Sequence, residues 1–405
     1  MTDEQALSAR DLQDAREAPG GSSTTSGGDR RARRPRIASL DLVRGLMLVA
    51  TVVLGSLLAT PEWIDHATWA SVHPADTLFP VFVTLSGCGL AFALRRGVRF
   101  GVLIRRTLVL LAAGLLYSAI LSGSWALDTW RVTGVLQIYA VVVAVLGLLH
   151  LVTRSWRGWA VVTALFAVAH TVLLSGWAER CVGGVLTREC NPSGAIDVLV
   201  FSAAHIYQHG GAGHDPEGLV ASLGALVSAS AGMTVGHLLL SVRRRSLDRS
   251  AGVGTAVLPL IALAAAFLAA AFVLTWAPTL LGAQPVPMMK RLWSPPFALA
   301  LASATTIALL LGHLLVDRAG TGRVIRGLSY PILALGRNSL LVYFGSHVLM
   351  GLLTRPLPDG SIPAETIATT VAVAGHVQAT WTGLLLLFWI LLTSLLHRHR
   401  LYLRP

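Results

Sequence analysis

Ten apolar runs of about 20 residues constrain the fold of this chain more than any other feature. A helix of about 20 apolar residues is long enough to cross the ~30 Å hydrocarbon core of a bilayer. The runs lack the period-two alternation that transmembrane β-strands require. Hydrophobic residues make up 54% of the chain, charged residues only 13%, and the mean hydropathy is +0.66. The sequence therefore predicts an all-α, polytopic integral membrane helical bundle with about ten transmembrane helices. The runs are 42–58, 78–94, 103–121, 132–151, 159–174, 219–240, 253–276, 296–316, 340–353 and 382–396.

Basic residues are concentrated in alternate loops. Residues 30–36 and the loops on the same side of the membrane carry 22 arginines, whereas the loops on the other side carry six arginines or lysines. The 22 lie in 30–36, 95–106, 154–157, 243–249, 318–326 and 398–404. Cytoplasmic loops are enriched in Lys and Arg, so this bias predicts that both termini are cytoplasmic (N-in and C-in). The net charge of +12 is then a topology signal with attraction to anionic membrane lipid, and does not indicate nucleic-acid binding.

The first 36 residues differ from the rest of the chain. They have no apolar periodicity, and residues 20–28 consist only of Gly, Ser and Thr. Residues 1–36 are therefore predicted to be a disordered, basic cytoplasmic tail that precedes a single membrane domain, 37–405. The first apolar run is long enough to span the membrane, so it is expected to be a retained anchor and not part of a cleaved signal peptide. The plasma membrane is the expected location.

Two ionisable residues, His66 and Asp76, lie between the first two apolar runs. Ionisable groups at a membrane boundary lose solvation free energy, and they commonly mark a reaction or transport site. Histidine titrates near neutral pH, so an imidazole can act as a general base or a nucleophile, and a neighbouring carboxylate can orient it. In the simpler alternative, His66 and Trp69 belong to an interfacial belt and Asp76 caps the second helix.

The longest loop on the outer side, about 177–218, contains a concentration of polar residues. His205, Tyr207, Asp215 and Glu217 are candidates for an acceptor site that faces the outside. The segment Asp215–Gly218 is equally typical of a helix start, with Asp as N-cap and Pro at the first helical position. His205 and His209 are four residues apart, but no carboxylate completes a zinc motif, so no metal site is predicted.

The three cysteines divide between helix and loop. Cys88 lies within the second run and is interpreted as a small buried hydrophobic residue. Cys181 and Cys190 share the long outer loop, where an oxidising compartment permits a disulfide. Two unpaired thiols are the alternative.

Seven short motifs occur in a fixed order along the chain: Leu40–Gly45, His66–Trp69 with Asp76–Pro80, Gly134–Gln137, His205–Gln208, Asp215–Gly218, Lys290–Ser294 and Gly336–Tyr343. Together they resemble the heparan-α-glucosaminide N-acetyltransferase family over about residues 37–352. This resemblance implies a transmembrane acyltransferase domain in 37–405 that moves an acetyl group from cytoplasmic acetyl-CoA to an amino sugar across the membrane. It also implies that His66 is the active-site histidine and Asp76 its acidic partner.

The resemblance extends to the two substrates. It implies that Trp69, Gln137 and Trp293 join the polar loop residues in binding an extracytoplasmic saccharide acceptor. Arg44, Arg337 and Asn338 are candidates for binding acetyl-CoA, because an arginine fork matches phosphate oxygens. Snorkelling or helix pairing is the alternative for both arginines, and Asp41 lies one turn before Arg44 as a local ion-pair partner.

Two other classes of function remain open from the sequence. A transporter or flippase for a polar or glycolipid substrate also needs intramembrane His, Asp and Arg residues. Transporters often contain inverted repeats with paired broken helices, and the absence of a convincing repeat favours the enzyme. A membrane scaffold ranks third. The chain departs from the family motifs at Gly55, Ser71 and Ile138. The class of acyl donor and the type of reaction are therefore better supported than the identity of the acceptor. The oligomeric state, a homo-oligomer included, stays open.

The predicted topology can be tested with cysteines placed singly in 177–218 and in 243–249, in a chain whose native cysteines are replaced by serine. An impermeant thiol reagent should label the first segment only from the outside and the second only from the cytoplasm, because the basic loops are retained inside. The reverse pattern would contradict both the topology and acetyl transfer toward the outside.

Overall fold

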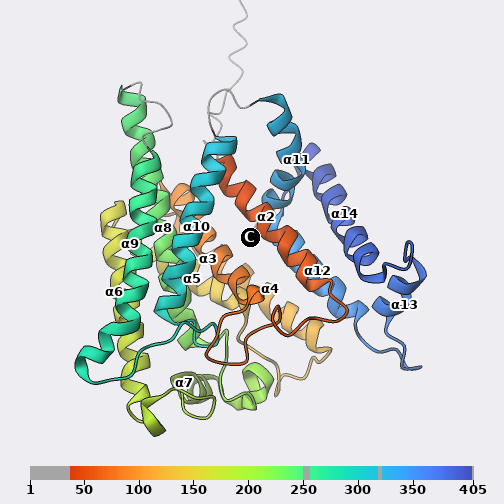
Figure 1. Ribbon diagram of the computed structural model, residues 1–405, viewed down its shortest axis with the longest axis horizontal. Coiled ribbons are helices and arrows are strands. Elements are labelled where there is room, and N and C mark those ends of the chain that lie inside the picture. The colour runs from red at the N-terminus through yellow and green to blue at the C-terminus, as the bar shows by residue number, and fades with distance from the viewer. Residues whose placement is uncertain (1–36, 250–255, 318–321, 404–405) are drawn as a thin grey trace, which may run out of the picture. The chain divides into compact units, whose positions relative to one another are not determined.

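Each apolar run forms a helix in the computed structural model, which describes residues 37–249, 256–317 and 322–403 (Figure 1). The predicted tail, 1–36, lies outside these ranges. The long helices are α2 (Ala38–Gly55), α3 (Pro74–Leu94), α4 (Phe100–Ser122), α5 (Val135–Leu149), α6 (Trp156–Ala178), α8 (Leu219–Arg249), α9 (Val257–Trp276), α10 (Pro295–Val316), α11 (Arg323–Arg337), α12 (Ser339–Leu353) and α14 (Val377–Arg398). Two shorter helices, α7 (Pro192–Phe201) and α13 (Pro363–Thr370), lie in connections. Within the described ranges there is no strand, so the all-α prediction is confirmed.

Eight of the helices are long and apolar enough to cross a membrane. The chain is thus a multi-pass membrane protein. Helices α11 and α12 form a ninth candidate span that is bent by 73° at Asn338. Helix α5 has only 15 residues and is shorter than a span. By length and composition, the part of the chain that the structure describes therefore contains eight or nine candidate spans, against about ten predicted.

Helix α5 nevertheless runs beside α8 for most of its length. Arg131, just before α5, forms an ion pair with Asp215, just before α8. At the other end of α5, the ring of His150 stacks on that of His237 of α8, with ring centroids 5.2 Å apart. The two helices are therefore parallel. A 15-residue helix is only about 22 Å long. The extended residues before α5 cover the rest of the distance that this part of the chain runs beside α8.

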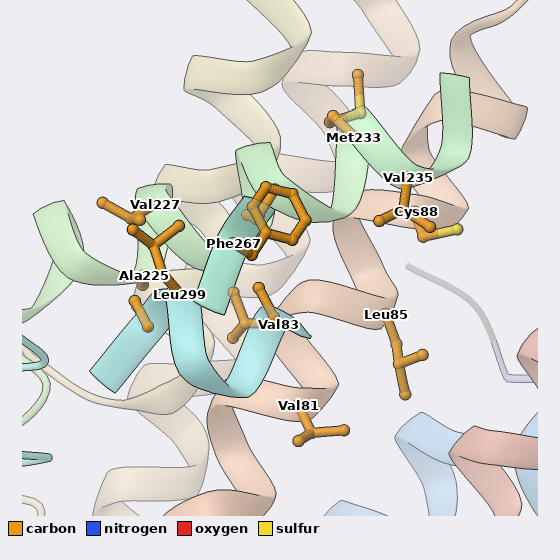
Figure 2. Packing of buried hydrophobic residues seen from close by; sticks show 14 of the residues in the cluster. Val81, Val83, Leu85, Cys88, Ala225, Val227, Met233, Val235, Phe267 and Leu299 are labelled. Atoms are coloured by element: carbon orange, nitrogen blue, oxygen red, sulfur yellow. The ribbon is translucent and has the colours of Figure 1, made fainter. Parts of the chain in front are cut away.

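Helices α3 and α8 form the centre of the bundle. Figure 2 shows apolar side chains of these two helices together with Phe267 of α9 and Leu299 of α10. Small residues bring the two backbones together, because a Cβ on Gly87 would collide with the Ala229 carbonyl and one on Gly232 with the Thr84 carbonyl. Such contacts between small residues are a common basis of helix packing in membranes.

The helices define two ends of the bundle. The segments 56–73, 123–134, 179–218 and 277–294 meet at one end, here called the loop end, where α7 and the connections before α3 and α10 lie (Figure 1). The opposite end, here called the basic end, includes 95–99 and 150–155. His66 and Asp76 are at the loop end, while Asp41 and Arg337 are near the basic end.

Helix α11 packs tightly on α2 through two glycines. A Cβ on Gly45 would collide with the Ile332 carbonyl, and one on Gly336 would collide with the Asp41 carbonyl. Neither helix can move away without loss of the ion pair between Arg337 and Asp41, 3.1 Å apart. The bend between α11 and α12 is thereby fixed against α2.

Gly336→Ala should lower the stability of the protein in detergent by about 1–3 kcal/mol, the usual cost of overpacking. Gly327→Ala is the matched control on the same helix, since a Cβ there meets nothing within 4 Å. Alanine favours a helix over glycine by roughly 0.5–1 kcal/mol, so the control should be neutral or stabilising. Thermal unfolding of both variants measures this, and equal midpoints would contradict the close contact of α2 and α11.

Candidate functional site

Asp76 links the start of α3 to the segment that carries His66. Its Oδ1 atom lies 2.7 Å from His66 Nδ1. Its Oδ2 atom accepts hydrogen bonds from the backbone N–H of His73, at 2.9 Å, and of Ala67, at 3.1 Å. His73 is the N-cap of α3, so Asp76 does cap the second predicted helix. The capping interpretation and the catalytic one are therefore compatible.

The geometry of this pair leaves one ring nitrogen of His66 available. With Nδ1–H donating to the carboxylate, Nε2 carries the lone pair, a tautomer assigned from the hydrogen-bond network. Among the described residues none makes a hydrogen bond to Nε2. The His66 side chain is 48% exposed, whereas that of Asp76 is fully buried. A half-exposed imidazole held by a buried carboxylate is a suitable general base.

A second cluster of charges closes the loop end. Arg131 Nη2 lies 2.9 Å from Asp215 Oδ1 and 2.8 Å from Glu217 Oε2. Lys290 Nζ is 3.3 Å from the other oxygen of Glu217. Asp215 also accepts hydrogen bonds from the Thr133 hydroxyl and from the backbone N–H of Tyr207. These contacts join three loops, so Asp215 and Glu217 have structural partners in place of a ligand.

The start of α8 differs from the sequence prediction. Asp215 accepts from the backbone N–H of Glu217 and so shapes the turn before the helix. The first N–H of α8, that of Leu219, donates instead to Asp197 Oδ1 of α7, at 2.7 Å. The helix-start alternative placed the cap at Asp215, which is local in sequence, whereas the acceptor for the Leu219 N–H is 22 residues away.

Burial and charge act in opposite directions on the acids of this cluster. Burial alone would raise the pKa of Glu217, but Lys290 and Arg131 lower it to about 2. Burial raises the pKa of Asp197 to about 6, despite its hydrogen bonds with Ser193 and the Leu219 N–H. Glu217 is therefore firmly ionised, and Asp197 is protonated more readily than Glu217.

A polar pocket of about 360 Å³ adjoins the His66 segment. Of the predicted acceptor residues, Tyr207 lines it directly, and Trp69 packs edge-on against the lining residue His214 with ring centroids 5.1 Å apart. The residues that line it are Thr68, Arg188, Glu189, Tyr207, Gln208, Gly211, Ala212, Gly213, His214 and Arg291. Arg188 and Arg291 were not predicted as site residues, although Arg291 lies within the motif Lys290–Ser294. Their place at the pocket depends on the fold, which brings them together from distant loops.

The other predicted acceptor residues do not line this pocket. Trp293 is buried, donates from Nε1 to Ser228 Oγ at 3.0 Å and packs against Phe79, which places it in the core. His205 Nδ1 contacts the Trp130 carbonyl at 2.8 Å and so fixes a neighbouring loop. The side chain of Gln137 is buried against α4, and within the described ranges its Nε2 has no partner. Their contact with an acceptor stays a prediction.

A smaller, mostly apolar recess of about 80 Å³ lies between α2, α12 and α14. A Cβ on Gly55 would meet nothing within 4 Å, so this glycine leaves the space open. His347 Nδ1 lies 2.7 Å from the Tyr343 carbonyl. The recess is lined by Thr51, Val52, Gly55, Ser346, His347, Leu349, Met350, Leu385 and Trp389.

The predicted donor residues divide into two groups. Arg337 of α11 contacts Asp41 of α2 and His397 of α14, so it joins three helices. The ion-pair partner of Asp41 is therefore Arg337 and not Arg44. Arg44 donates to the Leu85 carbonyl at 3.0 Å and has no carboxylate partner in the part of the chain that the structure describes. Asn338 is fully buried at the bend, and its Oδ1 has no partner among the same residues. Arg44 and Asn338 thus retain hydrogen-bonding capacity inside the bundle.

The cysteine alternatives are resolved in favour of a disulfide between Cys181 and Cys190, with Cys88 buried and free. Among the described residues no group of three His, Cys, Asp or Glu side chains has the arrangement of a metal site.

Comparison with known proteins supports the resemblance seen in the motifs. A family model described as heparan-alpha-glucosaminide N-acetyltransferase, catalytic, matches residues 36–182, which include His66 and Asp76. The heparan-alpha-glucosaminide N-acetyltransferase of Homo sapiens is 25% identical over 435 aligned residues, which cover 91% of this chain and 60% of that protein. The Mus musculus protein of the same name is 26% identical over 386 residues, covering 79% and 54%. The predicted resemblance is confirmed, and the chain spans little more than half the length of these relatives.

Glu217→Gln should destabilise the protein by about 3–5 kcal/mol, because it leaves the buried Lys290 without its carboxylate and the partly exposed Arg131 with Asp215 alone. Glu179→Gln, at an exposed acid after α6, is the matched control and should be nearly neutral. Thermal or denaturant unfolding in detergent measures both.

The pH dependence gives an independent check. The pKa of Glu217 is lowered from 4.5 to about 2, so its contribution to stability is present above pH 4.5 and is lost as the pH falls toward 2. The glutamine variant should lack this part of the acid destabilisation. Parallel pH profiles for the two proteins would contradict the ionised network.

Proposed function

We propose that this multi-pass membrane protein is an acetyltransferase that moves an acetyl or related short acyl group from cytoplasmic acetyl-CoA to an amine or hydroxyl of an extracytoplasmic saccharide. One observation carries the proposal: Asp76 holds His66 through Nδ1 and leaves Nε2 available, on a segment whose residue Thr68 lines a polar pocket. The similarity to the human and mouse N-acetyltransferases supports the same reaction class.

His66 has a defined task in this reaction. The acceptor amine or hydroxyl attacks the thioester carbonyl carbon, and His66 Nε2 accepts the proton that the acceptor loses. The C–S bond then breaks, the acyl group remains on the acceptor, and the proton passes from the imidazolium to the departing CoA thiolate. In the covalent alternative, Nε2 itself attacks the carbonyl carbon, and the C–S bond breaks to release CoA thiolate. The acceptor then attacks the acyl group, the bond from Nε2 to the acyl carbon breaks, and the imidazole passes the acceptor's proton to the thiolate. Asp76 stabilises the positive ring in either route.

The bundle contains a suitable place for the acyl group. The recess that contains Gly55 and His347 has about 80 Å³, roughly half of the ~150 Å³ apolar cavity that accepts benzene. By that scale it accommodates about three heavy atoms, which is the size of an acetyl group. Its lining is mostly apolar, as an acyl methyl group requires.

Donor entry from the basic end is supported by Arg44. This guanidinium lies inside the bundle on α2, contacts the Leu85 carbonyl of α3 and has no carboxylate partner among the described residues. A bound anion such as a CoA phosphate would compensate its charge. Arg337 already has Asp41, so its contribution is to join α11 with α2.

The acceptor side is supported by the polar pocket at the loop end. Tyr207, Gln208 and Glu189 offer donors and acceptors for sugar hydroxyls or an ammonium group. The neighbouring rings of Trp69 and His214 offer an apolar face. This combination suits a saccharide, whose rings have polar edges and apolar faces.

Transport remains the second candidate because of the bent helix pair. Broken helices at membrane depth often line substrate sites in transporters. Helices α11 and α12 are bent by 73°, and the buried Asn338 at the bend has an unpartnered oxygen within the described ranges. Mass balance separates the two functions, since a transferase releases one CoA thiol for each acylated acceptor and a transporter releases none.

The test uses purified protein, labelled acetyl-CoA and a panel of amino sugars. His66→Ala should lower the rate by about 10²–10⁴ because the general base is lost. Asp76→Asn should lower it as well, because the amide cannot stabilise the imidazolium. His376→Ala, at an exposed histidine of the same end, is the control and should keep full activity.

If incubation with labelled acetyl-CoA alone labels His66, the covalent route is correct. If an active enzyme shows no such label, the direct route is correct. A folded His66→Ala variant with normal turnover would contradict both.

A further inference from the structure

The segment that carries His66 is held by side chains from two distant loops. Arg291 Nε donates to the Ala67 carbonyl at 2.9 Å, and Arg188 Nη2 donates to the Thr68 carbonyl at 2.8 Å. Trp69 Nε1 in turn donates to the Leu186 carbonyl at 2.9 Å. Three consecutive residues after His66 are therefore fixed from outside their own loop.

The loop that supplies Arg188 and Leu186 is itself closed. The disulfide between Cys181 and Cys190 joins its two ends. Within it, the backbone N–H of Thr187 donates to the Cys190 carbonyl at 3.0 Å, and the N–H of Cys190 donates to Thr187 Oγ1 at 3.1 Å. A short cross-linked loop has little freedom, so it can serve as a rigid support for the His66 segment.

The base of this loop is also tied to the pocket. The Nδ2 amide of Asn191 lies within hydrogen-bond distance of the carbonyls of Thr187, Arg188 and Gly213, at 2.8–3.0 Å. Gly213 and Arg188 both line the polar pocket. The disulfide loop, the pocket wall and the His66 segment thus form one connected unit.

Both arginines also face the pocket. Each guanidinium has five N–H donors. Arg188 and Arg291 each use one nitrogen on a carbonyl of the His66 segment, and neither makes another hydrogen bond to a residue that the structure describes. Oxygen atoms of a ligand in the pocket would bind the remaining N–H groups of the same side chains.

From this arrangement we infer that Arg188 and Arg291 are positioning residues that connect the polar pocket to His66. They hold the Ala67 and Thr68 carbonyls, which keeps His66 against Asp76, and a bound acceptor fixes them further. The inference rests on the proposed function for the identity of the ligand, but the two backbone contacts do not depend on it. A displacement of about 1 Å in a catalytic group can cost roughly 10²-fold in rate.

The first experiment compares kcat and both KM values, with acetyl-CoA as donor and glucosamine as acceptor. Arg291→Met and Arg188→Met should each lower kcat about 10-fold to 100-fold because the base is displaced. They should raise the KM for glucosamine, because the pocket loses donors, and leave the KM for acetyl-CoA unchanged. Arg180→Met, an exposed arginine in the same loop that stacks on Trp177, is the control and should match the wild type.

The conservative variant separates positioning from bulk stability. Arg291→Lys keeps a cationic donor for the Ala67 carbonyl but loses the planar fork. It should therefore recover most of kcat while the KM for glucosamine stays raised. Reduction of the disulfide should lower kcat in the wild type, and a Cys181→Ser, Cys190→Ser double variant should show the same loss without reductant.

The second experiment does not need turnover. Diethylpyrocarbonate acylates histidine rings, and mass spectrometry follows the rate at His66. In Arg291→Met and Arg188→Met this rate should fall several-fold relative to the wild type and to Arg180→Met, because Asp76 no longer orients the ring. If the wild type transfers no acyl group but this difference is found, the positioning role stands and the proposed function fails. Unchanged kcat together with unchanged modification of His66 would overturn the inference.

Discussion

The arrangement of the site depends on how the buried carboxylate of Asp76 is compensated. A buried ionised carboxylate is costly unless hydrogen bonds replace the water that it loses. Asp76 receives these bonds from His66, from Ala67 and from the N-cap residue His73. The N-terminal end of a helix also favours negative charge, so α3 itself stabilises the group. One carboxylate therefore starts α3, closes the loop before it and fixes the tautomer of His66.

The rest of the bundle supports this point from both sides. Toward the loop end, the network of Arg131, Glu217 and Lys290 joins the segments before α5, α8 and α10, and the closed disulfide loop reaches the His66 segment. Toward the basic end, the glycine contacts and the pair of Arg337 with Asp41 fix the bend of α11 and α12. The recess beside His347 lies between these two supports. A short acyl group delivered from the basic end would thus meet an acceptor held at the loop end.

The sequence predicted features that depend on local patterns. Every apolar run is helical, because length and composition alone decide that outcome in a membrane. The number of candidate spans is smaller than predicted for two reasons. Helix α5 is too short to be a span, and the run after Asn338 is only half of a bent pair.

Features that depend on long-range contacts were missed. The partner of Asp41 is 296 residues away, and Asp197 replaces Asp215 as the acceptor for the first N–H of α8. Trp293 packs against Phe79 in the core, and its predicted contact with an acceptor stays a prediction. The pairing of His66 with Asp76, ten residues apart, was within reach of sequence reasoning.

The central claim is that an acyl group enters at the basic end and leaves on an acceptor at the loop end. Sealed vesicles that contain the protein with its basic end outward, trapped glucosamine inside and labelled acetyl-CoA outside test this claim most directly. The account predicts that labelled N-acetylglucosamine accumulates inside while CoA thiol is released outside in equal amount, and that a His66→Ala protein produces neither. Acetylation that occurs only when donor and acceptor share one side of the membrane would contradict it.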